Sequence, residues 1–140
     1  MSILVSKITD NSILEEAFKI RRQVFVIEQQ VDEAEEYEFE DISTHFIATV
    51  DGKYAGTARW RKTENGVKLE RFAGLEEYRS HKVGSALLLA VVADIPEEHQ
   101  YLYLHAQLTA MGLYSKYGFI AEGPMFEEAG IKHFKMVLKR

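Results

Sequence analysis

The sequence predicts a mixed α/β fold, in which one strand and one helix precede a run of hairpin strands. Two tight-turn signals, Asp51-Gly52 and Asn65-Gly66, separate three β-rich segments and predict two consecutive hairpins. An apolar stretch with helical spacing follows at residues 82–94, and β-rich segments return from residue 101. The expected order is strand, helix, three or more strands, helix, strand, helix, strand, strand. This order indicates a mixed layer rather than a strictly parallel alternation.

The first half of the chain supplies one strand, one helix and the hairpin strands. Residues 2–9 alternate in polarity, which is typical of a strand. Ser12-Ile13-Leu14-Glu15 has the form of a capping box, so a helix is expected from there to about Gln23. An apolar segment and an acidic stretch come next. The three antiparallel strands are expected at residues 45–50, 55–61 and 67–74.

The second half alternates helices with strands. In the helix expected at residues 82–94, apolar side chains recur at i, i+3 and i+4, and Pro96 follows its end. A short helix is expected between Thr109, a possible cap, and Gly118, a stop signal. The strands of this half are expected at residues 101–106, 119–122 and 132–138.

Length and composition indicate one soluble domain spanning residues 1–140. Hydrophobic residues make up 46% of the chain, which is enough for a core. No apolar run reaches the ~18 residues of a membrane-spanning helix, and the N-terminus does not read as a signal peptide. The absence of cysteine excludes disulfides, thiolate zinc sites and cysteine nucleophiles. We therefore expect a cytoplasmic protein with no membrane partner.

Charge is distributed unevenly along the chain. The net charge is −5, yet residues 28–41 contain eight acids and no lysine or arginine, so the remainder would carry +3. A mildly basic body suits an anionic ligand, while the acidic balance argues against nucleic acid. The acidic stretch has two readings: a solvated face, or an acidic lip that attracts a cationic amine.

A phosphate-binding loop is the most informative feature of the sequence. Residues 78–87 read Tyr-Arg-Ser-His-Lys-Val-Gly-Ser-Ala-Leu and join an expected strand to the start of an expected helix. The first amides of a helix have no internal partner and lie at the positive end of its dipole, so they bind anions. Arg79, His81 and Lys82 add positive charge, Gly84 permits close backbone approach, and Ser85 offers a hydroxyl.

This loop resembles the acyl-CoA-binding signature of the GNAT superfamily of N-acyltransferases: Arg or Gln, two residues, Gly, one residue, then Gly or Ala. Arg79 fills the first position and Gly84 the last, while Lys82 replaces the middle glycine. If that position requires a positive φ, Lys82 is strained where glycine would not be. The element order also matches, so the resemblance covers nearly the whole chain. It implies a GNAT-type mixed, mostly antiparallel twisted sheet of six or seven strands, flanked by about four helices.

The resemblance implies an N-acetyltransferase that moves the acetyl group of acetyl-CoA to a primary amine by direct attack. Neither a metal nor a covalent enzyme intermediate is then required, and the histidines show no metal-ligand spacing. The alternative is a GNAT-fold protein that binds CoA in a non-catalytic or regulatory role. The residues expected at the cofactor are Phe72, Ala73, Gly74, Arg79, Ser80, His81, Lys82, Val83, Gly84, Ser85 and Gln107, with a backbone N–H of Phe72 or Ala73 as oxyanion donor.

Tyr114, four residues before Gly118-Phe119, occupies the position of the family's proton donor to the departing thiolate. A core-covering aromatic is its structural alternative. Glu70, beside the loop, is the first expected base and Glu28 the second. Glu70 could instead form a plain ion pair with Arg71, Arg59 or Arg61, and a bulge in its strand would change which side chains share its face.

Four features resemble a narrower subgroup of small bacterial GNAT proteins. They are Arg22-Gln23-Val24-Phe25-Val26-Ile27-Glu28-Gln29, the acidic stretch followed by His45, Ala106-Gln107, and Ala129-Gly130-Ile131-Lys132-His133. If the fold is right, Glu28, His45 and His133 converge on the acceptor pocket; ordinary strand histidines are the alternative. The acceptor stays open among small-molecule amines and peptides. Homodimers are common in the family, but no interface stripe identifies one here.

Overall fold

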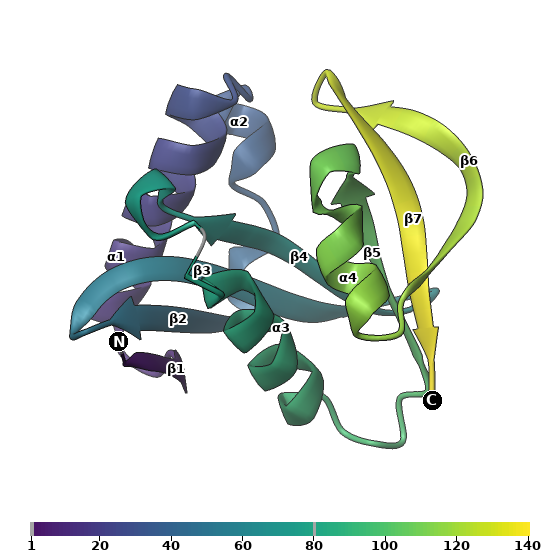
Figure 1. Ribbon diagram of the computed structural model, residues 1–140, viewed down its shortest axis with the longest axis horizontal. Coiled ribbons are helices and arrows are strands. Elements are labelled where there is room, and N and C mark those ends of the chain that lie inside the picture. Colours follow the sequence, from purple (N-terminus) through teal and green to yellow (C-terminus); the bar gives the residue numbers. More distant parts are fainter. Residues whose placement is uncertain (1, 80) are drawn as a thin grey trace.

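The computed structural model describes residues 2–79 and 81–140. Their strands form a seven-stranded sheet of order β1-β2-β3-β4-β5-β7-β6 (Figure 1). All neighbouring strands are antiparallel except β4 and β5, which are parallel. The strands are β1 (Ile3–Lys7), β2 (Thr44–Val50), β3 (Lys53–Thr63), β4 (Gly66–Gly74), β5 (Tyr101–Gln107), β6 (Ile120–Glu128) and β7 (Ile131–Lys139). The helices are α1 (Asn11–Arg21), α2 (Glu33–Glu36), α3 (Val83–Asp94) and α4 (Met111–Lys116).

The predicted fold class is confirmed, since the described residues form seven mostly antiparallel strands and four α-helices. The predicted capping box is wrong in one detail. Asp10 caps α1 instead of Ser12, because its carboxylate accepts a hydrogen bond from the Ser12 amide at 2.7 Å. Helical structure also continues past α1 as a π-helical segment, η1 (Arg22–Glu28), which extends beyond the predicted end at about Gln23. Single 3₁₀ turns occur at η2 (Glu40–Ile42), η3 (Glu76–Tyr78) and η4 (Leu108–Ala110).

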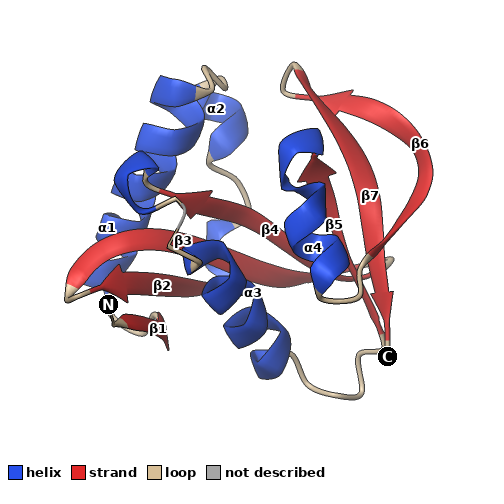
Figure 2. Cartoon of the chain, in the orientation of Figure 1, coloured by secondary structure: helices blue, strands red, loops and turns tan. Residues whose placement is uncertain are grey.

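Helices cover both faces of the sheet. Helices α3 and α4 lie in front of it in Figure 2. On this face, Leu69 of β4 and Leu87 of α3 belong to the larger buried cluster. On the other face, Ala17 and Ile20 of α1 pack with Ile47 of β2 in a smaller cluster. None of the helices in the described part of the chain is long and apolar enough to cross a bilayer.

A bulge in β4 changes which of its side chains share a face. Thr57 pairs with Ala73, but the next register pair is Arg59 with Glu70, so β4 has one residue more than β3 over this stretch. The extra residue lies at Arg71, whose φ of 58° is left-handed. Phe72 therefore packs on the α3 side and Ala73 on the α1 side, the reverse of plain alternation from Glu70.

A buried ion network joins the α1 side of the molecule to the centre of the sheet. Its members are Arg21 of α1, Glu36 of α2, Glu40 of η2, Arg59 of β3 and Glu70 of β4. The Glu40 carboxylate bridges the arginines, at 2.7 Å from Nη2 of Arg21 and 2.7 Å from Nη1 of Arg59. Removing one member would leave an uncompensated buried charge, so the network fixes how these elements sit together.

Three cations, Arg59, Arg61 and Lys68, surround the carboxylate of Glu70. Its Oε2 accepts hydrogen bonds from Nε of Arg59 and Nε of Arg61, each at 2.8 Å, and Nζ of Lys68 lies 3.3 Å from Oε1. Burial alone would raise the pKa of this carboxyl. The three cations outweigh burial and lower the pKa of Glu70 from an ordinary 4.5 to about 2.

This depressed pKa predicts acid sensitivity. An acid whose pKa is lower in the folded than in the unfolded state stabilises the fold above the unfolded value and loses that effect as pH falls. Between pH 4.5 and pH 2, Glu70 should therefore contribute a loss on the order of 3 kcal/mol in the free energy of unfolding. In urea unfolding, the free energy of unfolding of Glu70→Gln should fall by that much less over this pH range than that of the unsubstituted protein. Glu64→Gln, at an exposed position, should show the same pH dependence as the unsubstituted protein. Equal slopes for all three proteins would contradict the assignment.

Gly56 of β3 allows α3 to pack closely on the sheet. A Cβ at this position would lie 2.8 Å from Cγ1 of Val83 and 2.9 Å from the carbonyl oxygen of Ala73. Because that oxygen belongs to the backbone, Gly56→Ala should lower the free energy of unfolding by about 1–3 kcal/mol. Gly112→Ala in α4 is the control, since a Cβ there meets no atom within 4 Å. Chemical denaturation measures both, and equal stability of the two variants would count against this packing.

Candidate functional site

The two parallel strands at the centre of the sheet separate soon after they pair. Strands β4 and β5 pair only at Val67 with Leu102 and at Lys68 with Tyr103, and beyond these positions they diverge. A cavity lies on each side of this opening, one of about 380 Å³ and the other of about 430 Å³. Four residues line both cavities, and we call them the neck: Gln29, Phe72, Ala110 and Tyr114. A ligand that extends through the neck would reach from one cavity into the other.

The cavity of about 430 Å³, here the loop cavity, contains most of the residues predicted to bind the cofactor. Phe72, Ala73, Gly74, Arg79, Lys82, Val83, Gly84 and Ser85 line it. His81 does not line it, Gln107 lines the other cavity, and Ser80 lies outside the described residues. The first bond of α3 runs from the Ala86 amide to the Lys82 carbonyl, so the preceding amides are available to an anion.

Lys82, which replaces the middle glycine of the motif, adopts the backbone conformation that favours glycine. Its φ of 64° and ψ of 24° are left-handed, so the loop retains the glycine-type turn. Ordinary helical geometry, in which lysine would be unstrained, is therefore not what the structure has. A left-handed residue with a side chain costs roughly 1–2 kcal/mol. The backbone strain of the loop lies at Lys82, the point where the loop enters α3.

Arg79 ties the loop to its surroundings. Its Nε donates to the Gly74 carbonyl at 3.0 Å, and its Nη2 lies 3.0 Å and 2.9 Å from the two carboxylate oxygens of Glu28. Glu28 therefore faces the cofactor loop and lines neither cavity. The structure does not bring Glu28 to the polar cavity, since its side chain, at the end of η1, is paired with Arg79.

Tyr114 lies at the neck. It is only 6% exposed, and its ring makes edge-to-face contacts with Phe72 at 5.7 Å and Phe119 at 6.2 Å. Burial raises the pKa of this phenol well above its ordinary value of 10, so the hydroxyl stays protonated near neutral pH. The side chain is thus part of the core and also an available hydrogen-bond donor between the two cavities.

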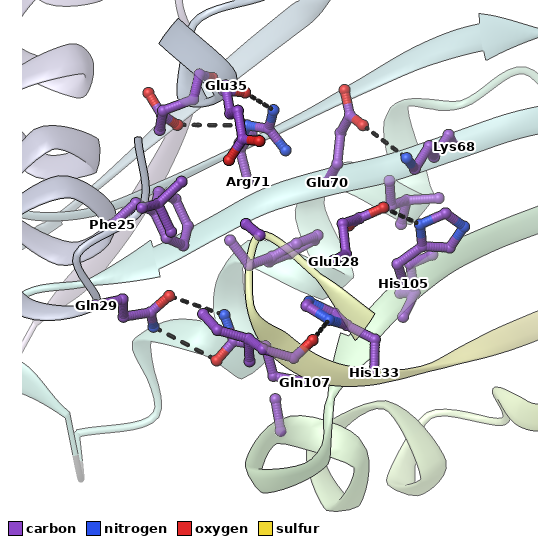
Figure 3. A pocket seen from close by; sticks show the side chains of 18 of the residues that line it. Phe25, Gln29, Glu35, Lys68, Glu70, Arg71, His105, Gln107, Glu128 and His133 are labelled. Carbon is purple, nitrogen blue, oxygen red and sulfur yellow. Dashed lines mark hydrogen bonds and ion pairs between the residues drawn. The ribbon is translucent and has the colours of Figure 1, made fainter. Parts of the chain in front are cut away.

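The cavity of about 380 Å³, here the polar cavity, lies between α2, β4, β5 and the β6–β7 hairpin (Figure 3). Five glutamates line it, Glu35, Glu36, Glu38, Glu70 and Glu128, together with two cations, Lys68 and Arg71. Two histidines, His105 and His133, complete the polar lining. The cavity therefore has an excess of acidic groups. The negative charge of Glu70 is compensated by the cations described above.

A pair of amides connects η1 to the end of β5. Nε2 of Gln107 donates to Oε1 of Gln29 at 2.9 Å, and Nε2 of Gln29 donates back to Oε1 of Gln107 at 3.4 Å (Figure 3). Gln29 belongs to one of the motifs of the sequence, but no pattern in the chain indicates this partner 78 positions away. Through this contact the end of β5 is held against the neck.

His45 does not reach either cavity, which corrects its predicted role at the acceptor. It lies on β2, which β3 separates from β4, and its Nε2 is 3.0 Å from the Glu40 carbonyl oxygen. Its ring packs against Phe18, and burial lowers its pKa. His133 is therefore the only one of the three residues expected at the acceptor pocket that lines the polar cavity.

Sequence reasoning missed several lining residues of the polar cavity. Lys68, Arg71 and His105 were not assigned to it, nor was Glu128 at the end of β6. Lys68, Arg71 and His105 share one signal, polar side chains in strands with a largely buried pattern, whereas Glu128 lies in the mostly exposed β6. Among the described residues, no group of three or more His, Asp or Glu side chains is placed to bind a metal ion.

Comparison with known proteins agrees with this geometry. The profile of the family described as "Acetyltransferase (GNAT) domain" matches residues 5–140. The uncharacterized protein YyaT of Bacillus subtilis is 35% identical over 137 residues, covering 94% of this chain and 93% of that protein. The uncharacterized N-acetyltransferase YjcF of the same organism is 35% identical over 127 residues, covering 89% and 91%.

Solved structures share the fold. Escherichia coli ElaA superposes with a TM-score of 0.83 at 24% identity, covering 99% of this chain and 100% of that one. A GNAT family acetyltransferase from Elizabethkingia anophelis with acetyl-CoA bound gives a TM-score of 0.73 at 14% identity, covering 99% and 98%. At these identities the structures show a common fold alone. The family profile and the 35% identical relatives go further, and they show that this chain belongs to the GNAT acetyltransferase family.

Proposed function

We propose that this protein transfers the acetyl group of acetyl-CoA to a primary amine by direct attack, with both substrates bound at once. The observation that carries the proposal is the pair of cavities that meet at Tyr114. A donor bound at the α3 N-terminus and an acceptor in the polar cavity would meet at the neck. Bringing two reactants together in this way is itself a large source of rate enhancement.

Acetyl-CoA suits the loop cavity on chemical grounds. Its phosphates would accept hydrogen bonds from the first amides of α3, near Arg79 and Lys82. Its pantetheine arm would lie along the edge of β4 that faces the opening, which pairs with β5 only at Val67 and Lys68. A backbone N–H of Phe72 or Ala73 would stabilise the oxyanion. The structural relative with acetyl-CoA bound supports this choice of donor.

An acidic cavity favours a cationic acceptor. The carboxylates of Glu38 and Glu128 are about half exposed, and both line the polar cavity. A cationic amine would be attracted to them, which is how the acidic stretch at residues 28–41 could act. The alternative function, CoA binding without turnover, is favoured by the backbone strain at Lys82 and by the ion pair in which Glu28 holds Arg79.

Calorimetric titration with acetyl-CoA tests the donor site. The unsubstituted protein should bind acetyl-CoA but not ATP, and Gly84→Glu should weaken binding by at least about 100-fold, because juxtaposed like charges cost several kcal/mol. A Cβ at Gly84 would approach Cδ2 of Leu113 at 3.1 Å, a contact that a flexible side chain can relieve, so the fold should persist. Gly112→Glu adds the same charge outside both cavities and should bind normally.

Three results separate the candidate functions. Tight binding by Gly84→Glu would remove the loop assignment. Binding followed by thiol release with an amine from a panel of spermidine, glucosamine, kanamycin, lysine and a tripeptide would support the enzyme. Binding without thiol release for any of these amines would favour the non-catalytic alternative.

Tyr114→Phe tests the proton donor. The variant should lower kcat by about 10²-fold or more, the range for loss of a general acid, while the Kd for acetyl-CoA changes by less than about twofold. Thiol-release kinetics and calorimetry measure the two quantities. Tyr117→Phe is the matched control, because Tyr117 lines neither cavity. Unchanged kcat in Tyr114→Phe would show that this ring serves packing alone.

A further inference from the structure

The proposed transfer requires a group that accepts the proton of the attacking amine, and neither carboxylate expected in that role is available. Glu70 is 8% exposed and is held by Arg59, Arg61 and Lys68. Its depressed pKa makes it a weak base. Glu28 is paired with Arg79 and lies outside both cavities. The proton therefore needs a different acceptor.

His133 is placed close to the neck by strand register. It lies on β7 directly opposite Gln107 of β5, and directly opposed residues place their Cβ atoms about 5 Å apart on one face. Gln107 in turn is bonded to the neck residue Gln29. The His133 ring is 6% exposed, lines the polar cavity and stacks on Phe126 of β6 at 5.8 Å and 19°. Its position is therefore fixed from two neighbouring strands.

The hydrogen bond of His133 defines its tautomer. Nδ1 lies 2.7 Å from the carbonyl oxygen of Ile131, and a carbonyl oxygen can only accept a hydrogen bond. In the neutral ring Nδ1 therefore carries the hydrogen and Nε2 carries the lone pair. The Ala129-Gly130 turn, with φ of 52° and 76°, sets where β7 begins and hence where the Ile131 carbonyl lies. Within the described residues, Nε2 has no hydrogen-bond partner.

We propose, on the basis of the proposed function, that His133 is the general base, with Nε2 as the proton acceptor. The ammonium of the acceptor first gives one proton to solvent. The neutral amine nitrogen then attacks the thioester carbonyl carbon, a C–N bond forms, and the carbonyl π electrons move to oxygen. His133 takes the proton from nitrogen, the oxyanion collapses, and the C–S bond breaks. The sulfur receives a proton from Tyr114, which regains one from solvent as His133 releases its own. The proton lost by nitrogen thus balances the one gained by sulfur.

His105 is the competing histidine in the same cavity, and the structure does not favour it. It lies two residues before Gln107 on β5, about 7 Å further from the neck. Its Nδ1 is 3.0 Å from Oε2 of Glu128, just as Nδ1 of His133 is held by a carbonyl oxygen, so the greater distance of His105 from the neck is what distinguishes the two rings. His105→Gln is therefore the competing variant, and His99→Gln, at a position that lines neither cavity, is the control.

Two measurements test the base. In ¹⁵N-histidine-labelled protein, long-range ¹H–¹⁵N spectra should show the His133 ring at pH 8 protonated at Nδ1 and bare at Nε2; the opposite tautomer would overturn the proposal. In thiol-release assays with the panel amine that turns over fastest, His133→Gln should lower kcat by about 10²-fold or more. Its acetyl-CoA Kd should change by less than about twofold. His105→Gln should lower kcat by a smaller factor than His133→Gln, and His99→Gln, outside both cavities, should leave kcat unchanged. Added imidazole should partly restore turnover in His133→Ala.

The outcomes separate this proposal from the proposed function. The base assignment alone would be overturned if His133→Gln keeps kcat within about threefold, or if His105→Gln lowers kcat as much as His133→Gln does. Failure of the unsubstituted protein to bind acetyl-CoA would overturn the proposed function, and the base assignment with it. The spectra of the unsubstituted protein keep the tautomer testable even if substitution of the buried His133 prevents folding.

Discussion

Strands β4 and β5 pair through Val67 with Leu102 and Lys68 with Tyr103, and the rest of the site depends on the fact that this pairing stops there. Parallel neighbours need a crossover connection, and α3 supplies it, so its N-terminus comes to lie at the end of β4. Beyond Lys68 the edge of β4 faces an opening instead of a strand. The loop cavity and the polar cavity lie on either side of that opening and meet at Tyr114.

The bulge at Arg71 adapts β4 to this geometry. It turns Phe72 toward Tyr114 on the α3 side, while Glu70 stays on the α1 side within the buried ion network. The network has a structural role for the same reason that Glu70 is a poor base. Three cations stabilise its ionised form, and a carboxylate that is strongly stabilised has little tendency to take up a proton. His133 has no ion-pair partner among the described residues, and its Nδ1 is held by the carbonyl oxygen of Ile131.

The cofactor loop includes two features that act against anion binding. Lys82 holds a left-handed conformation at a cost of roughly 1–2 kcal/mol, although its charge suits a phosphate. Glu28 holds Arg79 in an ion pair beside the same loop, and a phosphate would compete with it. Both features would lower the affinity for acetyl-CoA under the proposed function. They are also the observations on which the alternative, CoA binding without turnover, rests.

The sequence by itself determined the order of the strands, the Asp51-Gly52 hairpin, the start of α3 and the position of Tyr114 in α4. Turn residues, helical periodicity and helix termini act through neighbours a few positions away, so they can be read from the chain. Tertiary structure alone decided the partners of Glu70, the pairing of Glu28 with Arg79 and the location of His45 away from the site. Each of these rests on contacts between residues far apart in sequence, or on a bulge or π-helical segment that shifts side chains by one position. Because one such shift reverses the face on which a side chain lies, pattern alone could not distinguish a base from an ion-pair partner.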